Sequence, residues 1–180
     1  MRGLVFTEFL DFVEDTAGPE TLEAMIEACN LSSGGAYTAV GYYDHAELVA
    51  MLGFLEQATG QAAANMLRAF GRRLFATLAE AHRVLLGDGE ELLDFLDQVE
   101  GHIHHEVRKL YPDAELPRID TERPAPDRLI LHYRSSRPFA ALAHGMIEGA
   151  AEHFEIPLTI TPLGPAAAQG GRADFELRAA

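Results

Sequence analysis

Residues 118–137 read RIDTERPAPDRLILHYRSSR, and this stretch decides the fold class. Apolar and polar residues alternate in RLILHYRS (128–135), which is typical of a β-strand with one buried face. RIDTER (118–123) predicts a second strand, and PAPD between the two runs predicts a turn. Further along, PLTITPL (157–163) and ADFELRA (173–179) predict two more strands. The C-terminal part is therefore expected to form a small antiparallel sheet.

Apolar residues at helical spacing dominate the rest of the chain. The segments with this spacing are 3–12, the run after Pro19, the run after Asp44, 66–78, about 90–110 and 138–154. Asp44 and Glu47 have the D-x-x-E spacing of a capping box, which predicts that a helix begins there. Helices followed by an antiparallel sheet are the α+β pattern, and 180 residues suit a single domain.

Gly71 lies in the middle of the apolar face of residues 66–78. A glycine inside a helix costs about 1 kcal/mol relative to alanine. We therefore expect that something approaches the backbone closely at this position.

The charge balance excludes one class of partner. The chain has 28 acidic and 14 basic residues, and its formal net charge of -14 repels a phosphate backbone. Nucleic-acid binding is not expected. No apolar run reaches the ~18 residues of a membrane span, and the N-terminus lacks the features of a signal peptide. The single cysteine cannot form an internal disulfide, so we expect a cytoplasmic protein that does not bind membranes.

The densest cluster of chemically active side chains is His102, His104 and His105. On a helix whose apolar stripe centres near Ile103 and Val107, His105 points away, whereas His102 and His104 each flank the stripe at about 100°. The spacing of helical zinc motifs is absent. Periodicity therefore leaves His102 and His104 as candidates, beside the alternative that the histidines are solvated surface residues.

A second cluster is the Y-x-S-x-R pattern of Tyr133, Ser135 and Arg137. On a strand, residues at i, i+2 and i+4 share one face, so a phenol, a hydroxyl and a guanidinium are expected side by side. A guanidinium binds a carboxylate through two hydrogen bonds, and each hydroxyl adds another. The row suits an anionic ligand, although an exposed polar strand face is the alternative.

Taken together, these segments resemble the haem-nitric oxide/oxygen binding (H-NOX) family, the sensor domain of soluble guanylate cyclases and of bacterial stand-alone homologues. The residues that carry the resemblance are His104, Val107, Leu110, Tyr111, Pro112 and Pro117, followed by Tyr133, Ser135 and Arg137. The segments MRGLVFTEFLDFVE, YTAVGYYDHAEL, LRAFGRRLF and GMIEGAAEHF also resemble their family counterparts in the same order. The resemblance covers essentially the whole chain.

The resemblance implies a bound haem b (iron protoporphyrin IX) with His104 as its iron ligand. The absence of C-x-x-C-H agrees with non-covalent attachment. The haem is expected between a distal helical subdomain (about 1–60) and a proximal subdomain with the sheet (about 61–180). The other residues that the resemblance places at the haem are Tyr133, Ser135 and Arg137 on the propionates, Pro117 bending the porphyrin, Val5, Phe9, Leu67 and Leu74 packing on or above it, and Gly71 as the close approach.

The resemblance also bears on gas selectivity. Oxygen-binding members of the family carry a distal tyrosine at the position that corresponds to Leu142. The residue that supports this tyrosine corresponds to Leu74, and the aromatic residue opposite it corresponds to Phe9. None of these three side chains is a hydrogen-bond donor here, which implies binding of nitric oxide and carbon monoxide with discrimination against oxygen. His144 is the nearby donor whose direction stays open.

The implied output is a signal rather than a reaction. Release of His104 and relaxation of the haem off Pro117 are expected to let the subdomains rotate. No catalytic residue set is present, so the chain is not expected to be an enzyme, and the family suggests a separate histidine kinase or cyclic-di-GMP enzyme as effector. The alternatives are a haem-free or haem-storage interaction module of the same fold, and a haem enzyme, against which the lack of a distal acid–base pair argues.

Overall fold

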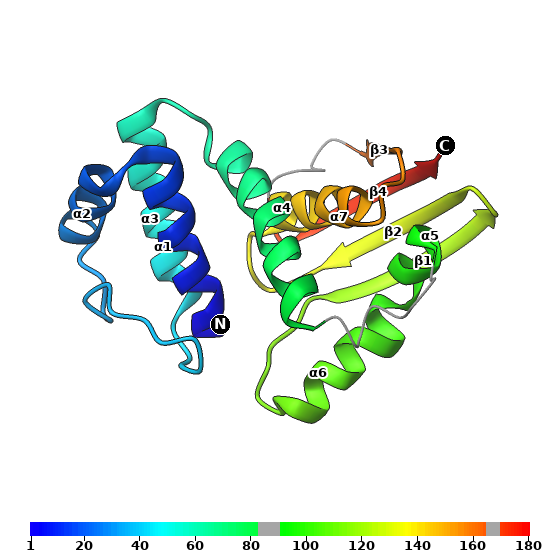
Figure 1. Cartoon of the computed structure of the whole chain (residues 1–180), viewed down its shortest axis with the longest axis horizontal. Helices are drawn as coiled ribbons and strands as arrows, with labels where there is room; N and C mark the ends of the chain where they lie inside the picture. Colours follow the sequence, from blue (N-terminus) through cyan, green and yellow to red (C-terminus); the bar gives the residue numbers. More distant parts are fainter. Residues whose placement is uncertain (83–90, 165–169) are drawn as a thin grey trace. The chain divides into compact units, whose positions relative to one another are not determined.

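The computed structural model describes residues 1–82, 91–164 and 170–180 (Figure 1). These residues form two compact units, Met1–Phe70 and Gly71–Ala180. Helices precede a small antiparallel sheet along the chain, so the expected α+β class is confirmed. Among the described helices, none has both the length and the apolar composition needed to cross a bilayer.

The first unit is helical. Its elements are α1 (Gly3–Ala17), α2 (Pro19–Ala28), α3 (His45–Thr59) and the first part of α4 (Ala63–Ala81). α1 continues beyond Phe12, where the apolar spacing ended, as far as Ala17. Pro19 occupies the first turn of α2, where its fixed φ suits a helix and its missing N–H costs nothing. Gly60 ends α3 in the left-handed conformation, with a φ of 71°.

The beginning of α3 confirms Asp44 as its cap, although the cap hydrogen bond comes from Ala46 and not from Glu47, as a capping box requires. The carboxylate of Asp44 accepts a hydrogen bond from the backbone N–H of Ala46 at 2.9 Å. The reciprocal half was wrong, because the buried Glu47 carboxylate accepts hydrogen bonds from Ser32, Ser33 and Tyr37 instead. Glu47 therefore ties the preceding loop to α3.

The second unit contains the sheet. Its strands are β1 (Arg118–Ala125), β2 (Arg128–Arg134), β3 (Leu158–Leu163) and β4 (Arg172–Ala179), in the order β1-β2-β4-β3. All three pairings are antiparallel, so the four expected strands are confirmed. α7 (Ala140–His153) connects β2 to β3 and lies along the sheet (Figure 1).

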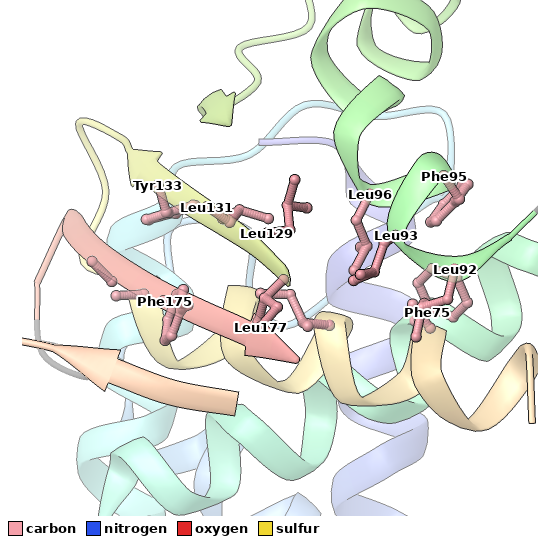
Figure 2. Packing of buried hydrophobic residues seen from close by; sticks show 14 of the residues in the cluster. Phe75, Leu92, Leu93, Phe95, Leu96, Leu129, Leu131, Tyr133, Phe175 and Leu177 are labelled. Atoms are coloured by element: carbon pink, nitrogen blue, oxygen red, sulfur yellow. The ribbon is translucent and has the colours of Figure 1, made fainter. Parts of the chain in front are cut away.

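The core of this unit lies on one face of the sheet (Figure 2). Leu129, Leu131 and Tyr133 alternate toward it from β2, as period-2 alternation requires. Helical residues such as Phe75 and Leu92 cover them. The core-facing side chains of β2 are therefore buried almost completely.

The helix expected at 90–110 is interrupted. Its described part consists of α5 (Leu92–Gln98), a π-helical turn η2 (Val99–Ile103) and α6 (His104–Leu110), and the expected beginning at Glu90 lies outside the described residues. In η2 the backbone N–H of His104 donates to the carbonyl of Val99, five residues back. A π-helical turn contains one more residue than an α-helical turn, which rotates the residues that follow it around the helix axis. The prediction that Leu110 belongs to the buried apolar stripe was therefore wrong, because Leu110 is 61% exposed.

Candidate functional site

His104 is the first residue of α6, directly after the π-helical turn. Its side chain is only 13% exposed, whereas His102 and His105 are exposed residues. Atom Nδ1 of His104 lies 2.9 Å from Oε2 of Glu100. The structure thus separates His104 from His102, the two candidates that helical periodicity left open.

The surroundings of His104 determine its charge. Burial lowers the pKa of the imidazole, and the hydrogen bond to Glu100 opposes this shift. Burial works against ionisation of Glu100 as well, but hydrogen bonds from His104, Arg108 and the Ile119 backbone outweigh it and hold its pKa below the usual range. The net lowering of the His104 pKa favours the neutral imidazole, the form that binds metal ions.

The Y-x-S-x-R residues come together, but not as expected. β2 ends at Arg134, so the predicted common strand face of Tyr133, Ser135 and Arg137 was wrong. The bend after the strand brings them together instead: Ser135 Oγ accepts a hydrogen bond from the Arg137 backbone N–H at 3.0 Å. Burial raises the pKa of Tyr133, opposed by its hydrogen bond with Ser135 and by the Arg137 cation.

Arg137 is only 8% exposed and already binds a carboxylate. Its Nη1 donates to the backbone carbonyl of Glu115 at 2.8 Å, and its Nη2 forms an ion pair with the Glu115 side chain. That side chain is 78% exposed, so the carboxylate that Arg137 binds lies at the protein surface. The contact also fixes the segment that leads to Pro117, which is half-buried.

Gly71 is a point of close backbone contact between α4 and α7. A Cβ atom there would collide with the Leu142 carbonyl and lie 3.0 Å from the Met146 nitrogen. The expected close approach is therefore confirmed, but the group that approaches is α7. Leu74, one turn further along α4, is buried, and Leu142 is half-buried.

His144 is directed toward the sheet. Its ring centroid lies 5.2 Å from that of Phe175 on β4, and the residue is 6% exposed. Its neighbour two residues earlier, Leu142, lies about 200° away around α7.

The remaining candidates belong to the unit Met1–Phe70. Phe9 and Leu67 are buried and Val5 is half-buried. The Phe9 ring packs edge-on against Phe70, with centroids 5.1 Å apart. The other candidate residues all belong to the unit Gly71–Ala180.

Sequence reasoning missed two acidic residues of this site. Glu100 precedes His104 by four residues, a spacing that places two side chains on the same helical face and was available as a signal. Glu115 has no such signal, because its contact with Arg137 spans 22 residues and depends on the tertiary fold.

The sequence and the structure were compared with those of known protein families and proteins. A family model described as Haem-NO-binding matches residues 2–162. The chain belongs to the H-NOX family. The Fe(II) unliganded H-NOX protein from K. algicida is 32% identical with a TM-score of 0.93, over 100% of this chain and 97% of that one. No curated protein sequence matches significantly.

Two further H-NOX structures contain bound gases. The H-NOX of Shewanella woodyi, solved in the Fe(II)CO state with IWP-051 bound, is 37% identical with a TM-score of 0.83 over 100% of this chain and 95% of that one. The S. oneidensis H-NOX in the Fe(II)NO state shares the fold, with a TM-score of 0.90 at 23% identity over 100% and 99% of the chains. H-NOX domains bind haem and act as sensors rather than as catalysts.

The donor set of this chain fits a haem. Among the described residues, no three His, Cys, Asp or Glu side chains gather into a site for a bare metal ion. A haem iron needs only an axial ligand from the protein, and a histidine such as the largely buried His104 is a common one. Arg137, which already binds the Glu115 carboxylate, has the chemistry that a propionate requires.

Proposed function

We propose that this chain is a haem-based sensor of nitric oxide and carbon monoxide that discriminates against oxygen, with His104 as the iron ligand. The observation that carries the proposal is the largely buried imidazole of His104, whose Nδ1 lies 2.9 Å from Oε2 of Glu100. Because this contact engages Nδ1, Nε2 is the nitrogen that would bind the metal. A bound haem b would supply the ferrous iron at which a diatomic gas binds.

Three side chains would bind the haem propionates. Arg137 supplies a fixed guanidinium, and Ser135 and Tyr133 supply hydroxyl groups beside it. Pro117 follows the Glu115 segment that Arg137 holds, which supports its role in pressing on the porphyrin. The remaining residues proposed to line the haem site are Val5, Phe9, Leu67 and Gly71. Gly71 contributes by allowing α7 to approach α4.

The proposed selectivity depends on missing donors. Phe9, Leu74 and Leu142 are hydrocarbon side chains, so they give no hydrogen bond that would favour oxygen over nitric oxide. His144 packs on Phe175 of the sheet, which supports the view that it supplies no donor to the ligand either.

The signal would arise from movement of the chain itself. His104 would leave the metal when nitric oxide binds, and the segment around Pro117 would relax. The proposed subdomains of about 1–60 and 61–180 would then change their relative orientation, and a separate histidine kinase or cyclic-di-GMP enzyme would detect the change. Only a difference in ligand affinity between the two states can drive such a shift.

Reconstitution with haemin tests the iron ligand. The wild-type protein is expected to retain haem on a desalting column, whereas His104→Gly loses it unless imidazole is supplied. His105→Gly, which removes the exposed neighbour, is the matched control and should retain haem. Normal retention in His104→Gly without imidazole would refute the assignment, and failure of the wild-type protein to bind haem would favour a haem-free interaction module.

A further inference from the structure

The carboxylate of Glu100 connects three elements of the second unit. Its Oε2 lies 2.9 Å from Nδ1 of His104 at the beginning of α6 and accepts a hydrogen bond from the Ile119 backbone N–H of β1 at 3.2 Å. Its Oε1 accepts a hydrogen bond from Arg108 at 2.8 Å. Both oxygens are thus bound, which fixes the orientation of the carboxylate.

This arrangement determines which nitrogen of His104 carries the proton. Both oxygens of Glu100 already accept hydrogen bonds from N–H groups, Oε2 from Ile119 and Oε1 from Arg108, so the carboxylate faces His104 as an acceptor and Nδ1 of His104 is the donor. The lone pair of Nε2 is then available to a metal. A neutral imidazole alone in water has no such enforced choice between its two tautomers.

The same carboxylate ties the imidazole to the sheet. Ile119 pairs with Tyr133 across the β1–β2 register, and Tyr133 belongs to the buried core. Glu100 therefore connects His104 to a strand that is paired with the core strand β2. A displacement of His104 would break or pull on this contact.

We propose that Glu100 is a positioning residue for His104: it fixes the Nδ1–H tautomer and the ring orientation, and it strengthens electron donation from Nε2 to iron. The proposal rests on the proposed function of His104 as the iron ligand. Groups that hold the second nitrogen of a ligating histidine typically contribute about 10- to 100-fold to metal affinity.

The first test uses the haem-free protein. Long-range ¹H–¹⁵N spectra report the tautomer of His104, assigned by its disappearance in His104→Gly. We expect the Nδ1–H tautomer in the wild-type protein and in Glu100→Gln, whose amide oxygen still accepts, and a mixture of tautomers in Glu100→Ala. An unchanged tautomer in Glu100→Ala would overturn the proposal, whether or not the protein binds haem.

The second test uses the haem-loaded protein in the Fe(II) unliganded state. Glu100→Gln and Glu100→Ala are expected to shift the Fe–His stretching band to lower frequency and to speed haem transfer to apomyoglobin about 10- to 100-fold. Glu106→Gln is the matched control, because Glu106 is a neighbouring carboxylate that binds Lys109 at 2.6 Å. A merely structural contact would not move the Fe–His frequency.

The outcomes separate the two proposals. Haem retention with wild-type frequency and transfer rate in both Glu100 variants would overturn the role of Glu100 and leave the sensor function intact. Equal shifts in Glu106→Gln would also overturn it. Absence of haem binding by the wild-type protein would refute the sensor function, while the tautomer measured in the haem-free protein would still test the contact.

Discussion

Gly71 on α4 lies against the carbonyl of Leu142 on α7, with no space for a Cβ atom between the two backbones. A second glycine, Gly149 on α7, makes the same kind of contact with Arg72 on α4, where a Cβ would lie 2.8 Å from the carbonyl oxygen. The pair of contacts sets the distance between the two helices. Leu74 and Leu142, two of the proposed gas-selectivity residues, are carried on these helices.

Gly71→Ala should therefore destabilise the protein. The added methyl group meets backbone atoms that cannot move independently, and such overpacking costs about 1–3 kcal/mol. Urea unfolding measures the change. Gly53→Ala is the control, because a Cβ at Gly53 on α3 meets nothing within 4 Å, and it should stabilise by about 0.5–1 kcal/mol. Equal effects of the two substitutions would contradict the packing argument.

Arg137→Ala should weaken haem binding. Losing a charge-assisted hydrogen bond costs about 1.5–3 kcal/mol, which corresponds to roughly 10- to 150-fold in the haem dissociation constant. Haemin titration measures the constant, and a thermal melt of the haem-free variant measures the separate loss of the Glu115 ion pair. Arg134→Ala, which removes an arginine that pairs with Asp174 at 2.7 Å, is the matched control. A dissociation constant of Arg137→Ala equal to that of the control would argue against propionate binding by Arg137.

Glu47 should make the stability of the protein sensitive to acid. Burial opposes its ionisation, but hydrogen bonds from Ser32, Ser33 and Tyr37 outweigh this and hold its pKa below the ordinary 4.5. A carboxylate with a lowered folded-state pKa adds stability above its unfolded pKa, and this contribution is lost as the pH falls through the folded pKa. The free energy of unfolding should therefore fall below about pH 4.5.

Glu47→Gln should remove that part of the pH dependence and cost about 1–3 kcal/mol at pH 7, because the hydroxyl donors lose their charged acceptor. Denaturant unfolding at a series of pH values between roughly 3 and 7, which covers the usual pKa range of carboxyl groups, measures both effects. Glu23→Gln, on the exposed surface of α2, should change neither. A pH profile of Glu47→Gln that parallels the wild-type profile would count against this role.

The strands were predictable because their signal is local. Alternation of Leu129, Leu131 and Tyr133 with polar residues reports the buried face of β2 directly. The Asp44 cap was predictable for the same reason. The common strand face of Y-x-S-x-R was not, because nothing in the spacing shows that β2 ends at Arg134.

The details of the candidate site depend on longer-range effects. A single π-helical turn separates α5 from α6, and helical periodicity cannot detect one extra residue in a stripe. The need for a small residue at Gly71 was visible in the sequence, but its partner α7 lies far along the chain. The choice of His104 over His102 came from the family resemblance, and the burial of His104 appears only in the folded chain.

The absorption spectrum of the anaerobically reduced, haem-loaded protein tests the central claim most directly. Separate portions are exposed to nitric oxide, carbon monoxide and air. We predict a five-coordinate ferrous spectrum that shifts with nitric oxide and with carbon monoxide but gives no stable oxygen complex in air. A stable oxygen complex would contradict the selectivity assigned to Phe9, Leu74 and Leu142, and no response to nitric oxide would contradict the sensor itself.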